Sequence, residues 1–109
     1  MSSRGIKLYL EDIRESIKKI EKYTRGMDFT EFSRDMKTVD AVIKNLFVIG
    51  EAANNIPKEI KLKYPEVSWR EISGMRNKIA HEYFGIDEEI LWKTIKEDLP
   101  IFKKQISKI

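Results

Sequence analysis

Apolar residues recur along the start of the chain with the period of an α-helix. Between residues 6 and 20 they are separated by four, three, four and three positions, and charged residues fill the intervals. The stripe consists of Ile6, Leu10, Ile13, Ile17 and Ile20. Residues spaced in this way share one face of a helix, so the pattern predicts an amphipathic helix that ends near Gly26.

A second long helix is predicted over residues 36–55, with an apolar surface wider than a single stripe. One row comprises Val39, Val42, Leu46, Ile49, Ala53 and Ile56, and an adjacent row comprises Ile43, Phe47 and Gly50. A face of this width indicates burial against more than one neighbour. Just before it, Asp28 and Glu31 have the spacing of a capping box, which predicts a short helical turn.

Proline and polar caps mark the elements that follow. Pro57 ends the second long helix, and residues 58–63 can form one further turn. Ser68 and Glu71 have the spacing of another capping box, which predicts the start of a third main helix that Gly85 closes or follows.

Asp87 is the predicted cap of a last helix. Its apolar stripe comprises Leu91, Ile95, Leu99, Phe102, Ile106 and Ile109. Pro100 lies inside this stripe and should kink the helix or divide it in two. Because no alternating strand pattern is present, the chain is expected to form an all-α bundle of four to five helices, in a single domain over residues 1–109.

Composition narrows the classes of function. The chain has 41% hydrophobic and 36% charged residues, which is typical of a globular protein, and Lys and Arg exceed Asp and Glu by 21 − 18 = 3. This small positive charge would not repel a polyanion, but the excess of basic residues is smaller than in a dedicated DNA-binding protein. The absence of cysteine excludes disulfides, thiol catalysis and zinc–thiolate sites. One histidine cannot build an ordinary metal site, so no metal or other cofactor is predicted, although carboxylates could still hold magnesium.

No stretch of the sequence has the pattern of a membrane or secretory segment. The first twenty residues carry several charges, and no apolar run approaches the roughly 18 residues that a membrane span needs. A cytoplasmic protein is therefore expected.

The segment from Arg76 to Tyr83 holds the only histidine of the chain, His81. Histidine is the side chain whose ordinary pKa lies closest to neutral pH, which suits it to proton transfer. Arginine presents permanently charged, bidentate donors that match a phosphate. Asn77 and His81 are four residues apart and would lie one turn from each other on a helix. Phosphate chemistry with proton transfer is the hypothesis that these residue types favour.

RNA cleavage is the reaction that fits such a set of groups. RNA carries its own nucleophile, the 2′-hydroxyl, so cleavage needs a base, an acid for the leaving oxygen and positive charge at the phosphorane. Acid and base are two roles, whereas the chain has one histidine. A two-fold dimer would bring two copies of the segment together, and we expect one composite cleft per dimer, lined by Arg76 and His81 from each chain. The wide apolar face of residues 36–55 offers the surface that this dimer would need.

The stretch Gly74–Gly85 closely resembles the signature of HEPN-domain proteins, R-x-x-x-x-H-x-Y with Asn after the Arg. Residues 40–43, 49–52, 65–69 and 98–100 are similar to the HepT-like branch, so the resemblance covers essentially the full chain. It implies a HEPN-type helical homodimer that acts as a metal-independent endoribonuclease, usually the toxin of a toxin–antitoxin pair. The implied partner is a small nucleotidyltransferase antitoxin of the MntA type, encoded beside the toxin.

The resemblance also implies roles for single residues. Arg76 and His81 match the catalytic pair, and Asn77 matches a residue that supports the polar site. Tyr83 matches the tyrosine that the partner adenylylates to silence the toxin. AMP on this tyrosine would add bulk and negative charge where an RNA phosphate should bind.

Glu51 is a further candidate site residue. It stands in a small-residue patch, Gly50-Glu51-Ala52-Ala53, where helices can approach closely. Its carboxylate could orient Arg76, or it could be a partly exposed helix carboxylate without a role.

Two other functions fit the same fold. The chain could be a non-catalytic module that binds a nucleotide or the nucleotidyltransferase partner, which predicts saturable binding without RNA turnover. It could also be a helical assembly protein in which Arg76 and His81 only bridge subunits.

Overall fold

A computed structural model describes residues 5–82, 85 and 87–109, with residues 80–82 described by their backbone only. Among these residues the chain is helical and contains no strand, which confirms the all-α prediction. The elements are α1 (Ile6–Thr24), α2 (Phe29–Arg34), α3 (Met36–Asn54), α4 (Lys58–Lys63), α5 (Trp69–Glu82), α6 (Glu88–Lys93), the π-helical turn η2 (Thr94–Asp98) and α7 (Leu99–Ile106). None of the described helices has the length and apolar character of a membrane span.

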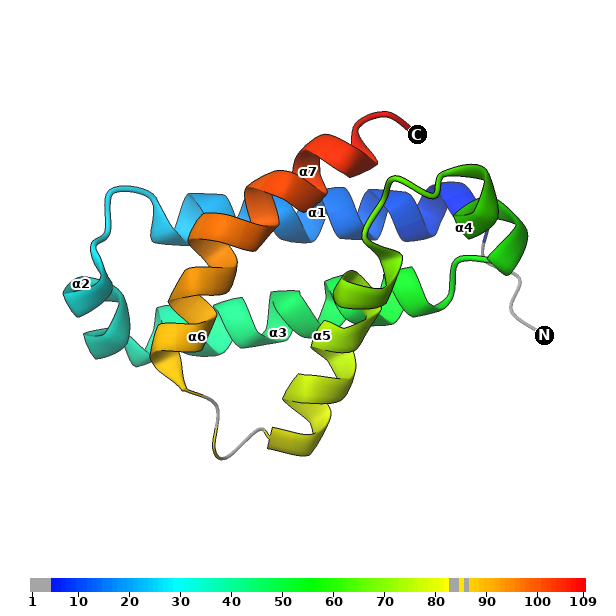
Figure 1. Ribbon diagram of the computed structural model, residues 1–109. Helices are drawn as coiled ribbons and strands as arrows, with labels where there is room; N and C mark the ends of the chain where they lie inside the picture. The colour runs from blue at the N-terminus through cyan, green and yellow to red at the C-terminus, as the bar shows by residue number, and fades with distance from the viewer. Residues whose placement is uncertain (1–4, 83–84, 86) are drawn as a thin grey trace.

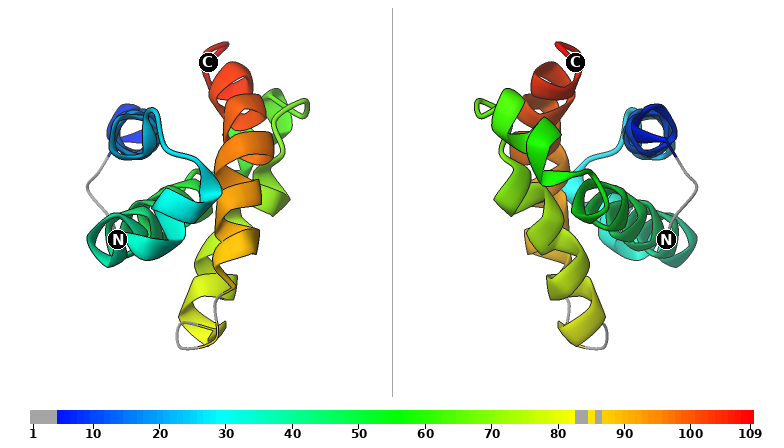
Figure 2. Two further views of the ribbon diagram at one scale, coloured as in Figure 1. Left: turned by 90° about the vertical axis from the view of Figure 1, so that its left-hand side faces the viewer. Right: turned by 90° about the vertical axis from the view of Figure 1, so that its right-hand side faces the viewer.

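The helices form two layers. Figure 1 shows α1 and α3 running antiparallel to each other, with α5 crossing α3 and the continuous α6–η2–α7 segment crossing both. In the side views of Figure 2 the α1–α3 pair forms one layer, and α5 with α6–η2–α7 forms the other. Helix α3 packs against α1 and also against α5, which confirms that its wide apolar face is buried by more than one neighbour.

The core lies between these two layers. Its fully buried side chains come from both layers and from the short helix α2, and they include Ile13, Ile17, Ile20, Phe32, Val42, Leu46, Ile49, Ile72 and Ile106. The apolar stripes predicted for the first, second and last helices therefore face the same interior.

Helices α2 and α3 each start at an aspartate, Asp28 or Asp35, whose side chain accepts a backbone N–H of the first turn. The capping box predicted at α2 is confirmed, because the Glu31 N–H donates to Asp28 Oδ1 at 2.8 Å and the Asp28 N–H donates to Glu31 Oε1 at 3.0 Å. At α3, Asp35 Oδ1 accepts the Thr38 N–H at 3.1 Å, and Asp35 Oδ2 accepts the Thr38 hydroxyl at 2.8 Å. These bonds, the backbone one first, hold the pKa of Asp35 below its ordinary value because they favour the ionised carboxylate.

The start of α5 is held by a residue far away in the sequence. The helix begins at Trp69, as predicted. The Ser68 N–H, however, donates to Gln105 Oε1 at 3.0 Å, and Gln105 Nε2 donates to Ser68 Oγ at 3.2 Å. Glu71 is exposed and forms neither bond of a capping box. The capping box predicted for Ser68 and Glu71 is therefore wrong, because α7 places Gln105 against Ser68.

A local cap at Asp87, a proline and two hydrogen bonds from Arg14 of α1 shape the last helical segment. Asp87 caps α6 through the Glu89 N–H at 2.8 Å, as predicted. Pro100 interrupts the regular α-helix without breaking the helical segment. Its ring would clash with a carbonyl of a regular α-helix, and the backbone widens into η2, where the Leu99 N–H bonds to Thr94 O. At the end of α7, Arg14 Nη2 donates to Ile106 O at 3.2 Å and to Ile109 O at 3.1 Å.

Candidate functional site

Arg76 lies where α5 crosses α3, directly over Gly50. A Cβ atom added to Gly50 would be 2.5 Å from the backbone nitrogen of Arg76 and 2.7 Å from its Cβ. No real side chain fits at such distances, so glycine allows the two backbones to approach this closely. The close approach fixes the position from which the Arg76 side chain starts.

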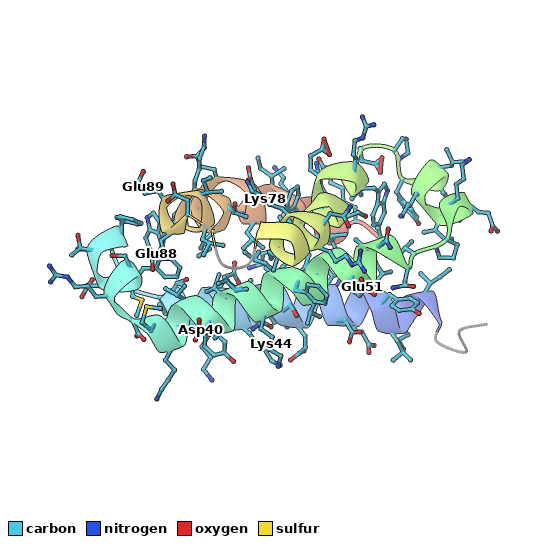
Figure 3. The ribbon with its side chains drawn as sticks, turned by 90° about the horizontal axis from the view of Figure 1, so that it is seen from below. Asp40, Lys44, Glu51, Lys78, Glu88 and Glu89 are labelled. Carbon is cyan, nitrogen blue, oxygen red and sulfur yellow. The ribbon has the colours of Figure 1, made fainter. Side chains whose placement is uncertain are left out.

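Glu51, the residue after Gly50, forms an ion pair with Arg76. Glu51 Oε1 is 2.9 Å from Arg76 Nε, although the two side chains are 44% and 40% exposed. The two facing atoms are themselves buried, and their alignment does not meet hydrogen-bond geometry, so the contact is a close charge pair with the Nε–H turned away from the line between them. Figure 3 shows Glu51 on α3 beside the C-terminal half of α5.

Asn77 contacts the other side of the same guanidinium. Arg76 Nη1 donates to Asn77 Oδ1 at 3.1 Å. The structure therefore brings together three of the predicted site residues, namely Arg76, Asn77 and Glu51. Among the described residues, Nη2 of Arg76 has no hydrogen-bond or ion-pair partner.

His81 lies in the last turn of α5, which ends at Glu82. Helix α5 thus runs through both Asn77 and His81 and sets them one turn apart along its axis, as predicted. The His81 side chain and the whole of Tyr83 lie outside the described residues. Figures 1 and 2 show that the C-terminal end of α5 extends beyond α3.

The second apolar row of α3, which is part of the wide face expected to offer surface for a dimer, is partly used within the chain. Gly50 is covered by Arg76 of α5, and Ile43 is partly buried against the core. Phe47 remains 36% exposed. Only part of this row is thus left for a second chain.

An open groove of about 330 Å³ lies beside Glu51, between α1 and α3. It is lined by Tyr9, Asp12, Phe47, Val48, Glu51, Ala52 and Asn55. Sequence reasoning missed this groove, although Phe47 and Glu51 are four residues apart and so share a face of α3. Glu51 lines this groove and also forms the ion pair with Arg76, so the groove reaches the carboxylate that contacts the guanidinium.

The charges around the site have mixed sign. Figure 3 shows Lys44 and Asp40 on α3, Lys78 on α5, and Glu88 and Glu89 on α6. Lys44 of α3 and Lys78 of α5 are both exposed, so they could meet a polyanion at this face.

The Arg76 guanidinium, held by Glu51 and Asn77, has the chemistry to bind a phosphoryl oxygen. The Arg76 guanidinium can supply positive charge and several hydrogen-bond donors to such an oxygen. In the described part of the chain, no three His, Asp or Glu side chains are grouped in a way that could hold a metal ion.

Comparisons with known proteins place the chain among one set of relatives. The family model "Ribonuclease HepT-like" matches residues 13–109. A protein of Thermococcus cleftensis named "Probable ribonuclease HepT" is 50% identical over 97% of this chain and 96% of its own length. A Methanocaldococcus jannaschii protein named "Putative RNase" is 42% identical over 97% of each chain, and one of the same name from Caldanaerobacter subterraneus is 40% identical over 93% of this chain and 90% of its own. No solved structure matched the chain.

Proposed function

The chain belongs to the HepT-like ribonuclease family, and from this membership we propose that it is an endoribonuclease and the toxin of a toxin–antitoxin system. The observation that carries the proposal is the Arg76 guanidinium, which Glu51 and Asn77 hold on two sides while its Nη2 stays without a partner in the described part of the chain. The same helix carries His81 five residues later. A phosphate-binding group and a proton-transfer group thus stand on one rigid element. Action on cellular RNA would place the protein in the cytoplasm.

The proposed reaction uses the 2′-hydroxyl of the RNA as its nucleophile. His81 of one chain removes the 2′ proton, and the oxygen attacks the adjacent phosphorus. His81 of the other chain protonates the departing 5′-oxygen, while Arg76 stabilises the negative charge of the phosphorane. The bond between phosphorus and the 5′-oxygen breaks, which leaves a 2′,3′-cyclic phosphate and a free 5′-hydroxyl. Each step uses a group of the protein or of the RNA, so we propose that no metal ion is required.

This mechanism needs a two-fold homodimer. The single histidine of the chain supplies one proton-transfer group, and an isologous interface supplies the second. The extension of the end of α5 beyond α3 supports this proposal, because it leaves the helix that carries His81 in reach of a second chain (Figure 2).

Regulation is proposed to act on Tyr83. An MntA-like nucleotidyltransferase would transfer AMP from ATP to the tyrosine hydroxyl and release pyrophosphate. The added phosphate carries negative charge and would lie within a few residues of His81, where it would repel the backbone of an RNA substrate.

The nuclease proposal is tested by incubating RNA with the purified chain in the presence of EDTA. We expect wild-type protein to cleave and to leave 2′,3′-cyclic ends. Arg76→Ala and His81→Ala should each lower the rate by about 10²-fold or more, because each removes a group that acts in the transition state. Arg70→Ala is the matched control, since Arg70 is an exposed arginine of the same helix.

Two outcomes would contradict the nuclease proposal. Undiminished cleavage by His81→Ala would show that another group transfers the protons. Saturable binding of nucleotide by wild-type protein without any RNA turnover would favour the non-catalytic binding module.

The regulatory proposal has a separate test. The chain is incubated with ATP, magnesium and the nucleotidyltransferase encoded beside it, and the mass of each peptide is measured. We expect one AMP on the peptide that contains Tyr83 and none on a Tyr83→Phe chain. Modification confined to Tyr64 or another tyrosine would refute the assignment.

A further inference from the structure

We propose that Glu51 is a positioning residue, which holds the Arg76 guanidinium so that its terminal edge, and not its side edge, meets the scissile phosphate. This inference rests on the proposed ribonuclease function and deepens it. It assigns the specific edge of Arg76 that binds the phosphate, and it assigns a role to a carboxylate on a different helix.

The first step is the geometry of the guanidinium. Arginine offers five N–H donors in a flat fork, with one edge formed by Nε and Nη2 and another by Nη1 and Nη2. Glu51 Oε1 lies 2.9 Å from Nε, and its negative charge disfavours a second anion at the first edge. Asn77 Oδ1 takes one hydrogen of Nη1 at 3.1 Å. Nη1 keeps a second hydrogen, and among the described residues Nη2 has no partner, so these two terminal nitrogens can still donate to phosphoryl oxygens.

The second step is the rigidity of the contact. Nε and Oε1 are both buried, and among the described residues neither atom has a hydrogen-bond partner. The absence of a side chain at Gly50 brings the α5 backbone against α3, so Arg76 and the neighbouring Glu51 start from fixed backbone positions. The contact with Glu51 therefore limits the rotation of the guanidinium about its long stem.

The third step is the charge. A carboxylate beside a phosphate-binding group opposes the binding of an anion, because it lowers the local positive potential. Removal of Glu51 should then leave RNA affinity equal or higher. The same removal frees the guanidinium to rotate, so the rate of the chemical step should fall. Opposite effects on binding and on rate distinguish positioning from a general structural role, which would lower both together.

The experiment compares Glu51→Ala, Glu51→Gln and a control, Glu59→Ala, which removes an exposed carboxylate of α4. Single-turnover cleavage and the dissociation constant for a non-cleavable RNA are measured for each. We expect Glu51→Ala to cleave about tenfold to hundredfold more slowly, a range set by the cost of small misplacements at a reacting centre. Its dissociation constant should not rise. Glu51→Gln keeps an oxygen near Nε and should cleave at an intermediate rate, and Glu59→Ala should behave as wild type.

A double-mutant cycle shows whether Glu51 acts through Arg76. Lysine keeps the positive charge of Arg76 but has no flat fork to orient. In an Arg76→Lys chain, Glu51→Ala should therefore slow cleavage by less than about threefold, since coupled residues are not additive. An equal loss in both backgrounds would overturn the proposal.

A nitrogen-15 NMR spectrum of the arginine Nε–H groups tests the contact without any reaction. The Arg76 signal should shift and broaden in Glu51→Ala and remain in place in Glu59→Ala. An unchanged Arg76 signal would overturn the positioning role, even if the protein cleaves RNA. Lack of RNA cleavage by wild-type protein would instead refute the proposed function, and the NMR result would still decide whether Glu51 orients Arg76.

Discussion

The backbone nitrogen of Arg76 lies 2.5 Å from the point where a Cβ atom of Gly50 would be. The spacing of α3 and α5 at the candidate site is thus set by the absence of a side chain at position 50. Because Glu51 follows Gly50, the same close approach brings the carboxylate to the guanidinium.

Gly50→Ala is predicted to lower both stability and RNA cleavage. The added methyl group would force α5 away from α3, because its nearest neighbours are backbone atoms and a Cβ, which cannot swing aside. Overpacking of this kind typically costs about 1–3 kcal/mol. Urea denaturation followed by circular dichroism measures the change, and RNA cleavage is assayed at a temperature where the variant stays folded.

Gly74→Ala is the matched control for Gly50→Ala. Gly74 is also a helical glycine, in α5, and a Cβ there would meet no atom within 4 Å. Alanine at this position should stabilise the protein by about 0.5–1 kcal/mol, because glycine loses more backbone freedom on folding. Equal behaviour of the two variants would contradict the close-contact explanation.

Gln105→Ala is predicted to destabilise the protein without abolishing RNA binding. Gln105 donates to and accepts from Ser68, and its loss leaves the first turn of α5 without its tertiary cap. We expect the free energy of unfolding to fall by about 1–2 kcal/mol, in line with the loss of two such bonds. Lys104→Ala, which removes an exposed neighbour in α7, should leave it unchanged. If Gln105→Ala and Lys104→Ala are equally stable, the hydrogen bonds between Gln105 and Ser68 contribute nothing to the free energy of unfolding.

The Asp35 cap predicts a particular dependence of stability on pH. Its pKa is lowered in the folded chain by the backbone and side-chain bonds to Thr38. The stabilisation by the ionised carboxylate is therefore fully present above the unfolded pKa, about 3.9, and is lost as pH falls through the lower folded pKa. As the pH falls below the unfolded pKa and through the folded pKa, the difference in free energy of unfolding between wild type and Asp35→Asn should shrink. Asp40→Asn, in the same helix, is the control, and an equal pH response of both variants would contradict the assignment.

Mixed dimers test the composite cleft. Wild-type and His81→Ala chains are mixed at equal concentration, allowed to exchange subunits and assayed for RNA cleavage. If both histidines of a dimer are needed, activity should fall to about a quarter of the wild-type value, because random pairing leaves that share of dimers with two histidines. Activity of about one half would show that each chain acts alone.

The secondary structure of this chain was largely predictable. The helix ends at residues 24, 54 and 63, and the caps at Asp28 and Asp87, follow from apolar spacing and from side chains within four positions. Such signals are local, since the hydrogen bonds of a helix and its caps connect near neighbours in the sequence. For the same reason Pro100 was expected to interrupt the last helix, and the structure shows how, through η2.

The site could be predicted only in part. The sequence by itself determined the helices and the signature of Arg76, Asn77 and His81 on one of those helices. Only the tertiary structure decided that Gly50 lies under Arg76, that Glu51 faces its Nε and that Gln105 replaces the cap expected from Glu71. These pairs are 25 to 37 residues apart. Their contact depends on where two helices cross, and that crossing is set by the packing of the whole core, which no local spacing encodes.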